Sequence, residues 1–176
     1  KITEIKAYPL KAARDIFVVK VETDEGIYGL GEGGCSSREL AEAEAVRHFS
    51  RFLIGMDPMR IEHIWQKCYR SNYHEGGRIL TGALSAIDIA LWDIMGKKLG
   101  VPVYQLLGGA CREHVFGFPT VSMDNPDCLA ICQDYIKAGW PCLRLGAATL
   151  TLLPSERAVA SQTWDAPGDL LYRGRV

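Results

Sequence analysis

The amino-acid sequence predicts an α+β domain followed by the first βαβ unit of a truncated TIM-type (β/α) barrel. Three observations support this fold class. Short segments with an apolar period of two come first, helical periods follow them, and a strand, a helix and a strand succeed one another after residue 110. A barrel of this type needs roughly 250 residues, and the sequence has far fewer than that after Gly109.

The composition is that of a globular protein. The chain has 176 residues, of which 48% are apolar and 23% charged, and its formal net charge is -1. This charge gives no reason to expect nucleic acid or an acidic membrane as a partner. No uninterrupted apolar run is long enough to span a bilayer, and the first ten residues lack the features of a signal peptide. We therefore expect a cytoplasmic protein with no nucleic-acid and no membrane partner.

The six cysteines are scattered, and none forms a C-x-x-C pair. In a reducing compartment we expect them to be free thiols that act as small, mostly buried residues. Cys128 and Cys132 lie one helical turn apart, so a metal clip is conceivable. Because no second ligand pair is near, ordinary packing is favoured over zinc.

Three strands are predicted at the start of the chain, joined as an antiparallel meander. They cover residues 2–10, 16–23 and 27–32. The second is the clearest, because Phe17, Val19 and Val21 recur at the period of a half-buried strand. Gly29 and Gly31 fall on one face of the third strand and leave room there for another element.

Two helices are predicted to follow the meander. Ser36 and Glu39 have the spacing of a capping box, so we expect Ser36 to be the N-cap of a helix that runs to about Leu53. The residues expected on its inward face are Leu40, Val46, Phe49 and Leu53. Asp57 and Pro58 are expected at the N-cap and first position of the second helix.

The longest helix is predicted within residues 76–109. One face carries Leu80, Leu84, Ile87, Leu91 and Ile94, and a second, thin face carries Ala83, Ala86 and Ala90. A helix that is apolar on two faces is buried between layers. Gly100 fits the left-handed position after its last turn, and Pro102 prevents its continuation. Asp88 and Asp93 must find hydrogen-bond donors there, because an unpaired buried carboxylate is costly, and a structural role is favoured over a catalytic one.

A βαβ unit is predicted after Gly109. Residues 115–121 and 142–145 form its strands, and a helix begins near residues 124–126. The residues expected on the inward face of this helix are Leu129, Cys132, Tyr135 and Ile136. The strands of such a unit are parallel and its crossover is right-handed. Residues 147–176 carry only a short helical period and are predicted to be an irregular tail.

The run SAIDIALWDIMGKKLGVPVYQLLGG, at residues 85–109, carries a family resemblance. It resembles the mandelate racemase and muconate-lactonising branch of the enolase superfamily, and within that branch the sugar-acid dehydratase-like members. The likeness extends from Lys1 to about Gly146. It implies a capping domain at residues 1–110, the start of a barrel at 111–146 and a tail of uncertain fold at 147–176. It also implies an Mg²⁺-dependent enzyme that abstracts the proton next to a substrate carboxylate, as in sugar-acid dehydration.

The resemblance further implies where the chemistry of the barrel lies. The metal ligands of the family are carboxylates on the third to fifth barrel strands, and this sequence reaches only the second, so no metal ligand is assigned and no Mg²⁺ is expected on this chain. Arg144 falls where racemase-like members carry the first lysine of Lys-x-Lys, and some dehydratase-like members carry arginine there. Arginine is a poor base but can clamp a carboxylate, which makes Arg144 a candidate catalytic residue. The alternative is an arginine paired with a neighbouring acid.

Two loops of the capping domain are implied to set specificity, at residues 11–15 and 32–38, and a third candidate loop precedes the longest helix. The candidate substrate-binding residues are Arg14, Glu32, Ser36, Arg38, Tyr73 and His74. Charges solvated on loops are the alternative for the first loops, and an exposed histidine without a partner is the alternative for His74.

Three hypotheses remain open. The first is a member or fragment of an Mg²⁺-dependent enzyme that acts on a small-molecule sugar acid when complete and is inactive as this chain alone. The second is a non-catalytic truncated protein that forms homo-oligomers through exposed barrel-facing surface. The third is a truncated or frame-altered product in which residues 147–176 never belonged to the fold. The sequence names no substrate and does not separate dehydration from racemisation.

Overall fold

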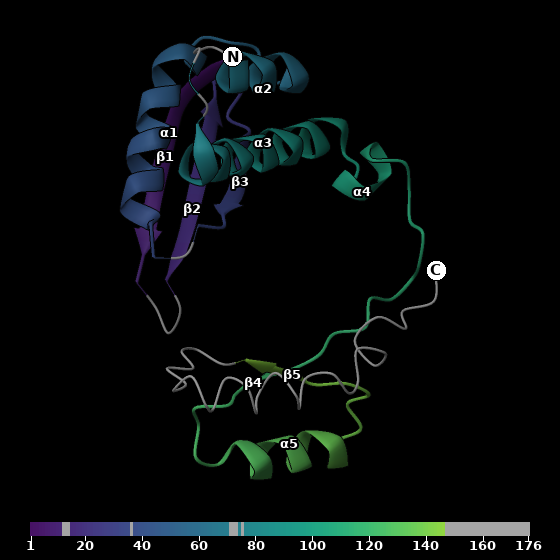
Figure 1. The fold of residues 1–176 in the computed structure, drawn as a ribbon. Helices are drawn as coiled ribbons and strands as arrows, with labels where there is room; N and C mark the ends of the chain where they lie inside the picture. The colour runs from purple at the N-terminus through teal and green to yellow at the C-terminus, as the bar shows by residue number, and fades with distance from the viewer. Residues whose placement is uncertain (12–14, 36, 71–73, 75, 147–176) are drawn as a thin grey trace. The chain divides into compact units, whose positions relative to one another are not determined.

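The computed structural model describes residues 1–11, 15–35, 37–70, 74 and 76–146. The chain divides into two compact units, Lys1–Cys111 and a second that begins at Arg112 (Figure 1). The first unit contains β1 (Ile2–Leu10), β2 (Ile16–Thr23), β3 (Tyr28–Gly33), α1 (Glu39–Leu53), α2 (Ile61–Arg70), α3 (Gly77–Leu99) and α4 (Val103–Leu106). The second contains β4 (Thr120–Ser122), α5 (Cys128–Lys137) and β5 (Arg144–Gly146).

The first three strands form an antiparallel sheet in the order β1-β2-β3, which confirms the predicted meander. Phe17, Val19 and Val21 of β2 are buried against the helices, as their alternation predicted. The turn between β2 and β3 places Gly26 at a φ of +76°, and its N–H donates to the carbonyl oxygen of Thr23 at 3.1 Å. Glycine adopts this conformation without steric cost, so the hairpin closes where the sequence predicted it.

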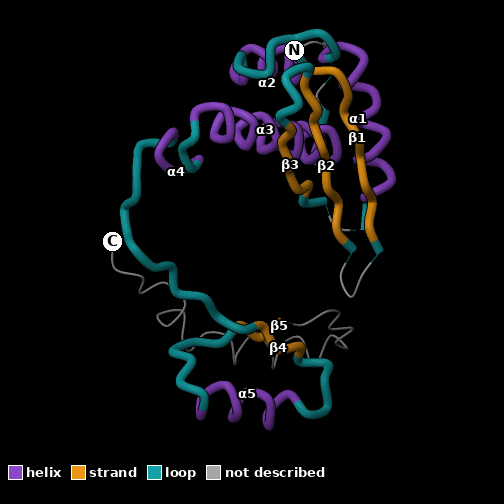
Figure 2. The backbone as a smooth tube through the Cα atoms, turned by 180° about the vertical axis from the view of Figure 1, so that it is seen from behind, coloured by secondary structure: helices purple, strands orange, loops and turns teal. Residues whose placement is uncertain are grey.

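Helix α3 crosses the sheet and packs directly on β3 (Figures 1 and 2). A Cβ atom added at Gly29 would lie 1.9 Å from the carbonyl oxygen of Ala90, and one at Gly31 would lie 1.9 Å from that of Ala86. No side chain larger than hydrogen fits at such an approach. The buried residues of α3 include Ala83, Leu84, Ala86, Ile87, Ala90, Leu91 and Ile94. The prediction of a helix apolar on two faces is confirmed, and its C-cap Gly100 has the expected left-handed φ of 69°.

Among the described residues, α3 is also the one helix long and apolar enough to cross a membrane, by length and composition alone. Its apolar side chains are the centre of the core of the first unit, where they pack against β2, β3 and α1. A core helix of this kind meets the same criterion as a membrane span. Its composition is therefore explained by packing.

The starts of two helices differ from the prediction. Helix α1 begins at Glu39 with Arg38 at the N-cap position and no side-chain cap hydrogen bond. The predicted N-cap, Ser36, lies outside the described residues and two positions before the observed one. Helix α2 begins at Ile61 because Asp57 forms a separate turn, in which its Oδ1 accepts the N–H of Met59 at 2.9 Å. The Asp-Pro sequence suits such a turn as well as it suits a helix start.

The inward face of α1 was predicted with one wrong member. Leu40 is 75% exposed, whereas Glu42 is fully buried. Positions two apart on a helix differ by roughly 200° in direction, so both cannot face the core. Glu42 lies in line with the buried residues Val46, Phe49 and Leu53 at spacings of four, three and four.

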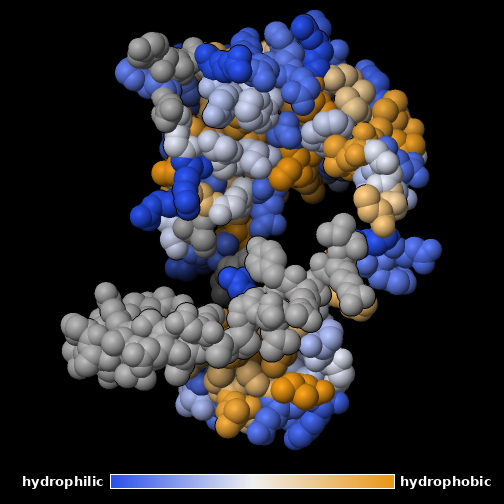
Figure 3. Space-filling model, turned by 45° about the vertical axis from the view of Figure 1, so that its right-hand side comes forward, coloured by the Kyte–Doolittle hydropathy of each residue, from blue (hydrophilic) through white to orange (hydrophobic). Residues whose placement is uncertain are grey.

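The second unit contains a parallel strand pair, as a βαβ unit predicts. Thr120 lies opposite Arg144, and Ser122 lies opposite Gly146. Both strands have 3 residues. Strand β4 covers only the end of the predicted strand at 115–121, and β5 begins two residues later than the predicted strand at 142–145. Leu129 and Ile136 were predicted to face inward but are 73% and 62% exposed, because two short strands offer α5 little surface to cover. Figure 3 shows apolar side chains at the surface of this unit. The predicted tail, residues 147–176, lies outside the described residues.

Candidate active-site loops of the capping domain

A hollow at the end of β3 is lined by four carboxyl side chains, from Asp15, Glu32, Glu39 and Glu42. We call it the acidic hollow. Asp15 precedes β2, Glu32 lies near the end of β3, and Glu39 and Glu42 lie in the first turn of α1. Carboxylate oxygens accept hydrogen bonds from hydroxyl groups and repel anions. The hollow therefore suits the hydroxyl-bearing part of a ligand and not its carboxylate.

Glu42 is the one described polar residue that is fully buried. Its Oε1 accepts the backbone N–H of Cys35 at 3.3 Å, and its Oε2 has no hydrogen-bond partner among the described residues. Burial raises the pKa of the Glu42 carboxyl group, the hydrogen bond from Cys35 opposes this, and the negative charge of Glu39 adds to it. The sequence prediction missed Glu42, although its place in the apolar stripe of α1 was a signal that could have found it.

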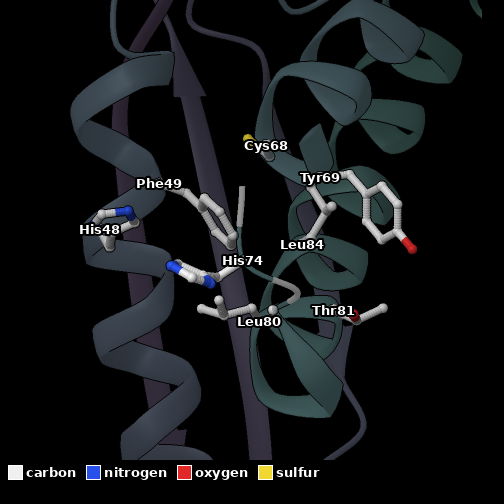
Figure 4. Close-up of a pocket in the computed structure, with 9 residues that line it drawn as sticks. His48, Phe49, Cys68, Tyr69, His74, Leu80, Thr81 and Leu84 are labelled. Atoms are coloured by element: carbon white, nitrogen blue, oxygen red, sulfur yellow. The ribbon is translucent and has the colours of Figure 1, made fainter. Parts of the chain in front are cut away.

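A second hollow lies where α1, the C-terminal end of α2 and the N-terminal end of α3 meet. His48 and Phe49 line it from α1, Cys68 and Tyr69 from α2, and Thr81 from α3, with His74 from the preceding loop (Figure 4). Burial raises the pKa of the Cys68 thiol to about 11, so this thiol stays protonated at neutral pH. A protonated buried thiol is a poor nucleophile, so Cys68 is not an activated nucleophile.

The structure places the predicted substrate-binding residues in two groups and leaves three unplaced. Glu32 is exposed and lines the acidic hollow. Arg38 is exposed beside the same loop, where its guanidinium donates to the carbonyl oxygen of Ser37 at 3.0 Å. His74 is exposed and lines the second hollow. The other three, Arg14, Ser36 and Tyr73, lie outside the described residues.

The candidate catalytic residue Arg144 is the first residue of β5, whereas the prediction placed it near the end of a strand at 142–145. Its N–H donates to the carbonyl oxygen of Pro119 at 3.0 Å, which fixes the backbone beside β4. Its side chain is exposed and forms no ion pair with an acid in the described part of the chain. An exposed guanidinium can form two parallel N–H···O bonds with a carboxylate, and the role of Arg144 stays a prediction.

No group of three or more His, Cys, Asp or Glu side chains in the described ranges is placed to hold a metal ion. This includes the acidic hollow and the pair Cys128 and Cys132. Mg²⁺ prefers near-octahedral oxygen ligands, usually with one or two carboxylates and several waters. No step of the chemistry is therefore assigned to a metal held by these residues.

An antiparallel meander covered by helices, followed by a parallel βαβ segment, is the architecture of an enolase-superfamily capping domain with the start of its barrel. The family model for the mandelate racemase / muconate lactonizing enzyme N-terminal domain matches residues 7–108. The chain belongs to this family. The resemblance seen in residues 85–109 is thereby confirmed.

Several curated relatives carry the name D-galactonate dehydratase. The D-galactonate dehydratase of Variovorax paradoxus is 45% identical over 161 residues, which cover 90% of this chain and 42% of the relative. The crystal structure of an enolase from Pantoea ananatis with bound D-gluconate and Mg is 40% identical, with a TM-score of 0.74 over 83% of this chain and 36% of that one. A member of the enolase superfamily from Salmonella Typhimurium is also 40% identical, with a TM-score of 0.65 over 69% and 32%. The chain spans less than half of the length of each.

Proposed function

We propose that this chain supplies the capping domain and the first two barrel strands of a sugar-acid dehydratase. The observation that carries the proposal is the 45% identity to D-galactonate dehydratase across 90% of the chain. In such a reaction a base removes the proton from the carbon next to the carboxylate, and the hydroxyl group on the following carbon leaves as water. The substrate is an aldonic or aldaric acid, and the protein is cytoplasmic.

The loops of the capping domain are proposed to select the substrate. Glu32 accepts hydrogen bonds from substrate hydroxyl groups in the acidic hollow, and Arg38 donates to them from the same loop. The remaining candidates, Arg14, Ser36, Tyr73 and His74, are proposed to add contacts from the neighbouring loops. Arg144 is proposed to hold the substrate carboxylate through two parallel N–H···O bonds, which an exposed guanidinium can form.

Mg²⁺ is proposed as the cofactor of the complete enzyme, since the Pantoea ananatis structure contains it together with D-gluconate. Its ligands are proposed to lie on strands that the described residues do not include. We accordingly propose that this chain alone is inactive and binds no Mg²⁺.

A second candidate function is that of a non-catalytic protein that forms homo-oligomers. The observation that favours it is the exposed apolar surface of the second unit, where Val115 is 83% and Phe116 is 86% exposed. Contiguous apolar surface of this kind is typical of an interaction site. Light scattering measures the oligomeric state of the chain. A stable homo-oligomer, together with a folded chimera (described below) that turns over no sugar acid, supports this second candidate.

The dehydratase proposal is tested by a chimera. Residues 1–146 of this chain replace the matching segment of the Variovorax paradoxus D-galactonate dehydratase, and the unchanged relative is the control. We expect Mg²⁺-dependent dehydration of D-galactonate or D-gluconate by the chimera. In that background Arg144→Ala should lower kcat/KM by about 10- to 100-fold, as the loss of a charged hydrogen-bonded pair does. A chimera that folds cooperatively but turns over no sugar acid contradicts the proposal.

A further inference from the structure

A socket for one carboxyl group lies where α1, α3 and the end of β3 meet. It contains the side chain of Glu42, and two glycines leave the space for it. A Cβ atom at Gly82 of α3 would lie 2.2 Å from Glu42 Oε1, and one at Gly33 of β3 would lie 3.2 Å from the same atom. The sequences of three separate elements thus accommodate this group.

The carboxyl group in the socket contacts the loop that follows β3. Its Oε1 accepts the N–H of Cys35 at 3.3 Å. A second carboxylate of the same helical turn acts from the surface, where Glu39 Oε1 accepts the N–H of Ser37 at 2.7 Å. The N–H of Arg38 closes the turn on the carbonyl oxygen of Cys35 at 3.0 Å. Side chains of α1 therefore hold the backbone at Cys35 from inside and at Ser37 from the surface.

Packing alone does not explain a glutamate at this position. An apolar side chain in line with Val46, Phe49 and Leu53 would bury without the cost of desolvating a carboxyl group. Buried polar groups of this kind are retained where their hydrogen bonds fix one arrangement over others. Here the hydrogen bond fixes the backbone at Cys35, in the loop that carries Glu32 before it and Arg38 after it.

We propose that Glu42 is a positioning residue, whose buried carboxyl group holds the backbone at Cys35, in the loop after β3, in the shape that contacts the substrate. The second half of this statement rests on the proposed function, and the first half does not. Glu42 borders the acidic hollow but is fully buried, so we assign it no direct contact with the substrate. It acts through the backbone of Cys35 and so determines where the side chains of Glu32 and Arg38 are presented.

The loop is tested in the full 176-residue chain, without any activity. The backbone amide of Cys35 should exchange its hydrogen at least ten-fold more slowly than the unstructured peptide does. Exchange at the unstructured rate would overturn the proposal. The second readout is alkylation of the Cys35 thiol by iodoacetamide, mapped by mass spectrometry against the exposed Cys111 of the same chain.

Three variants separate the hydrogen bond from charge and packing. Glu42→Leu removes the acceptor, and Gly82→Ala displaces the carboxyl group, so each should raise the alkylation rate of Cys35 at least five-fold relative to Cys111. Glu42→Gln keeps an acceptor oxygen without the charge and should stay within two-fold of the parent. The control Glu44→Gln removes a carboxylate of the same helix that pairs, within the described part of the chain, with exposed Arg47. If Glu42→Leu and Gly82→Ala both fold and leave the rate of Cys35 unchanged, Glu42 holds no loop.

The role in recognition is tested in the chimera. Glu42→Leu should raise KM for the sugar acid about ten-fold with kcat within two-fold, and Glu42→Gln should restore KM. An unchanged KM in a chimera whose Cys35 has become reactive would overturn the recognition role. A chimera that is inactive before any of these changes instead contradicts the proposed function, while the exchange and alkylation results still decide whether Glu42 holds the loop.

Discussion

At the scale of single residues, two glycines decide how close α3 comes to the sheet. A methyl group at Gly31 would lie 1.9 Å from the carbonyl oxygen of Ala86, which belongs to backbone and cannot move aside alone. We expect Gly31→Ala to lower the free energy of unfolding by about 3 kcal/mol, as overpacking of a core does. Guanidinium unfolding followed by circular dichroism measures this loss.

The matched control is Gly34→Ala, three residues along the same chain segment. A Cβ atom at Gly34 meets no atom within 4 Å. We expect its free energy of unfolding to change by less than about 1 kcal/mol. Equal losses in the two variants would show that the backbone of α3 does not approach β3 as described.

The burial of Cys68 can be tested through the reactivity of its thiol and through the pH dependence of the protein's stability. Its thiol pKa is raised from 9.0 to about 11 by burial. At pH 8 native Cys68 should therefore resist iodoacetamide, while the exposed Cys111 and Cys142 react. Because the unfolded chain loses this proton first, the stability contributed by Cys68 is present below pH 9 and is lost as the pH rises toward 11. Native Cys68 that reacts as fast as Cys111 would contradict its position.

The sequence predicted some residues of the candidate site and missed Glu42, which we propose positions them. Glu32 and Arg38 stand in a polar loop between a strand and a helix, where exposed charges are conspicuous. Glu42 stands inside an apolar stripe, where a charged residue is unexpected, whereas the apolar Leu40 was predicted on that face but lies off it. The contact between Glu42 and Cys35 also needs the glycine at position 82, which is distant in sequence and cannot be paired with them from one sequence.

At the scale of elements, α3 protects the outer edge of the sheet. The N–H of Leu30 on β3 donates to Asp93 Oδ2 at 2.9 Å, and Lys97 Nζ donates to the carbonyl oxygen of Tyr28 at 2.7 Å. Asp93 and Lys97 also pair with each other at 2.7 Å. The predicted need of Asp93 for donors is thereby met. Exposed strand edges are liable to pair with other chains, and we expect these two side chains to keep β3 from doing so.

Asp93→Ala tests the protected edge. We expect the free energy of unfolding to fall by about 1–3 kcal/mol, since the N–H of Leu30 loses its acceptor, and we expect concentration-dependent association in size-exclusion chromatography. Glu25→Ala is the control, because it removes only the exposed pair of Glu25 with Lys98. That control should cost less than about 1 kcal/mol and leave the elution volume unchanged. Association in both variants, or in neither, would refute the role of Asp93.

Elements whose apolar residues recur at a regular period in the sequence were predicted well. Elements whose ends are set by contacts with other parts of the chain were not. Strand β2 and helix α3 follow the apolar periods of the sequence, and α3 ends at the expected glycine. The start of α2 was misplaced because Asp57 and Pro58 suit a turn as well as a helix N-terminus. Strands β4 and β5 were predicted too long or displaced, because their ends are set by the three residue pairs that they share and not by their apolar runs.

At the scale of the whole molecule, the core belongs to the first unit. Its buried cluster joins residues from β1 and β2 of the meander and from α1, α2 and α3. We therefore expect residues 1–111 to fold alone and to unfold in one cooperative transition. Its denaturant midpoint, followed by circular dichroism, should equal that of the full chain. A fragment without cooperative unfolding would mean that the first unit depends on the rest of the chain.

The central claim is that the chain provides a capping domain whose chemistry needs carboxylates that the described residues do not supply. The most direct measurement is dehydration of D-galactonate and D-gluconate by the purified 176-residue chain with Mg²⁺, beside the chimera as the positive control. We expect no turnover and no calorimetric Mg²⁺ binding by the chain, and Mg²⁺-dependent turnover by the chimera. Turnover by the chain alone that is abolished by a chelator would contradict the claim.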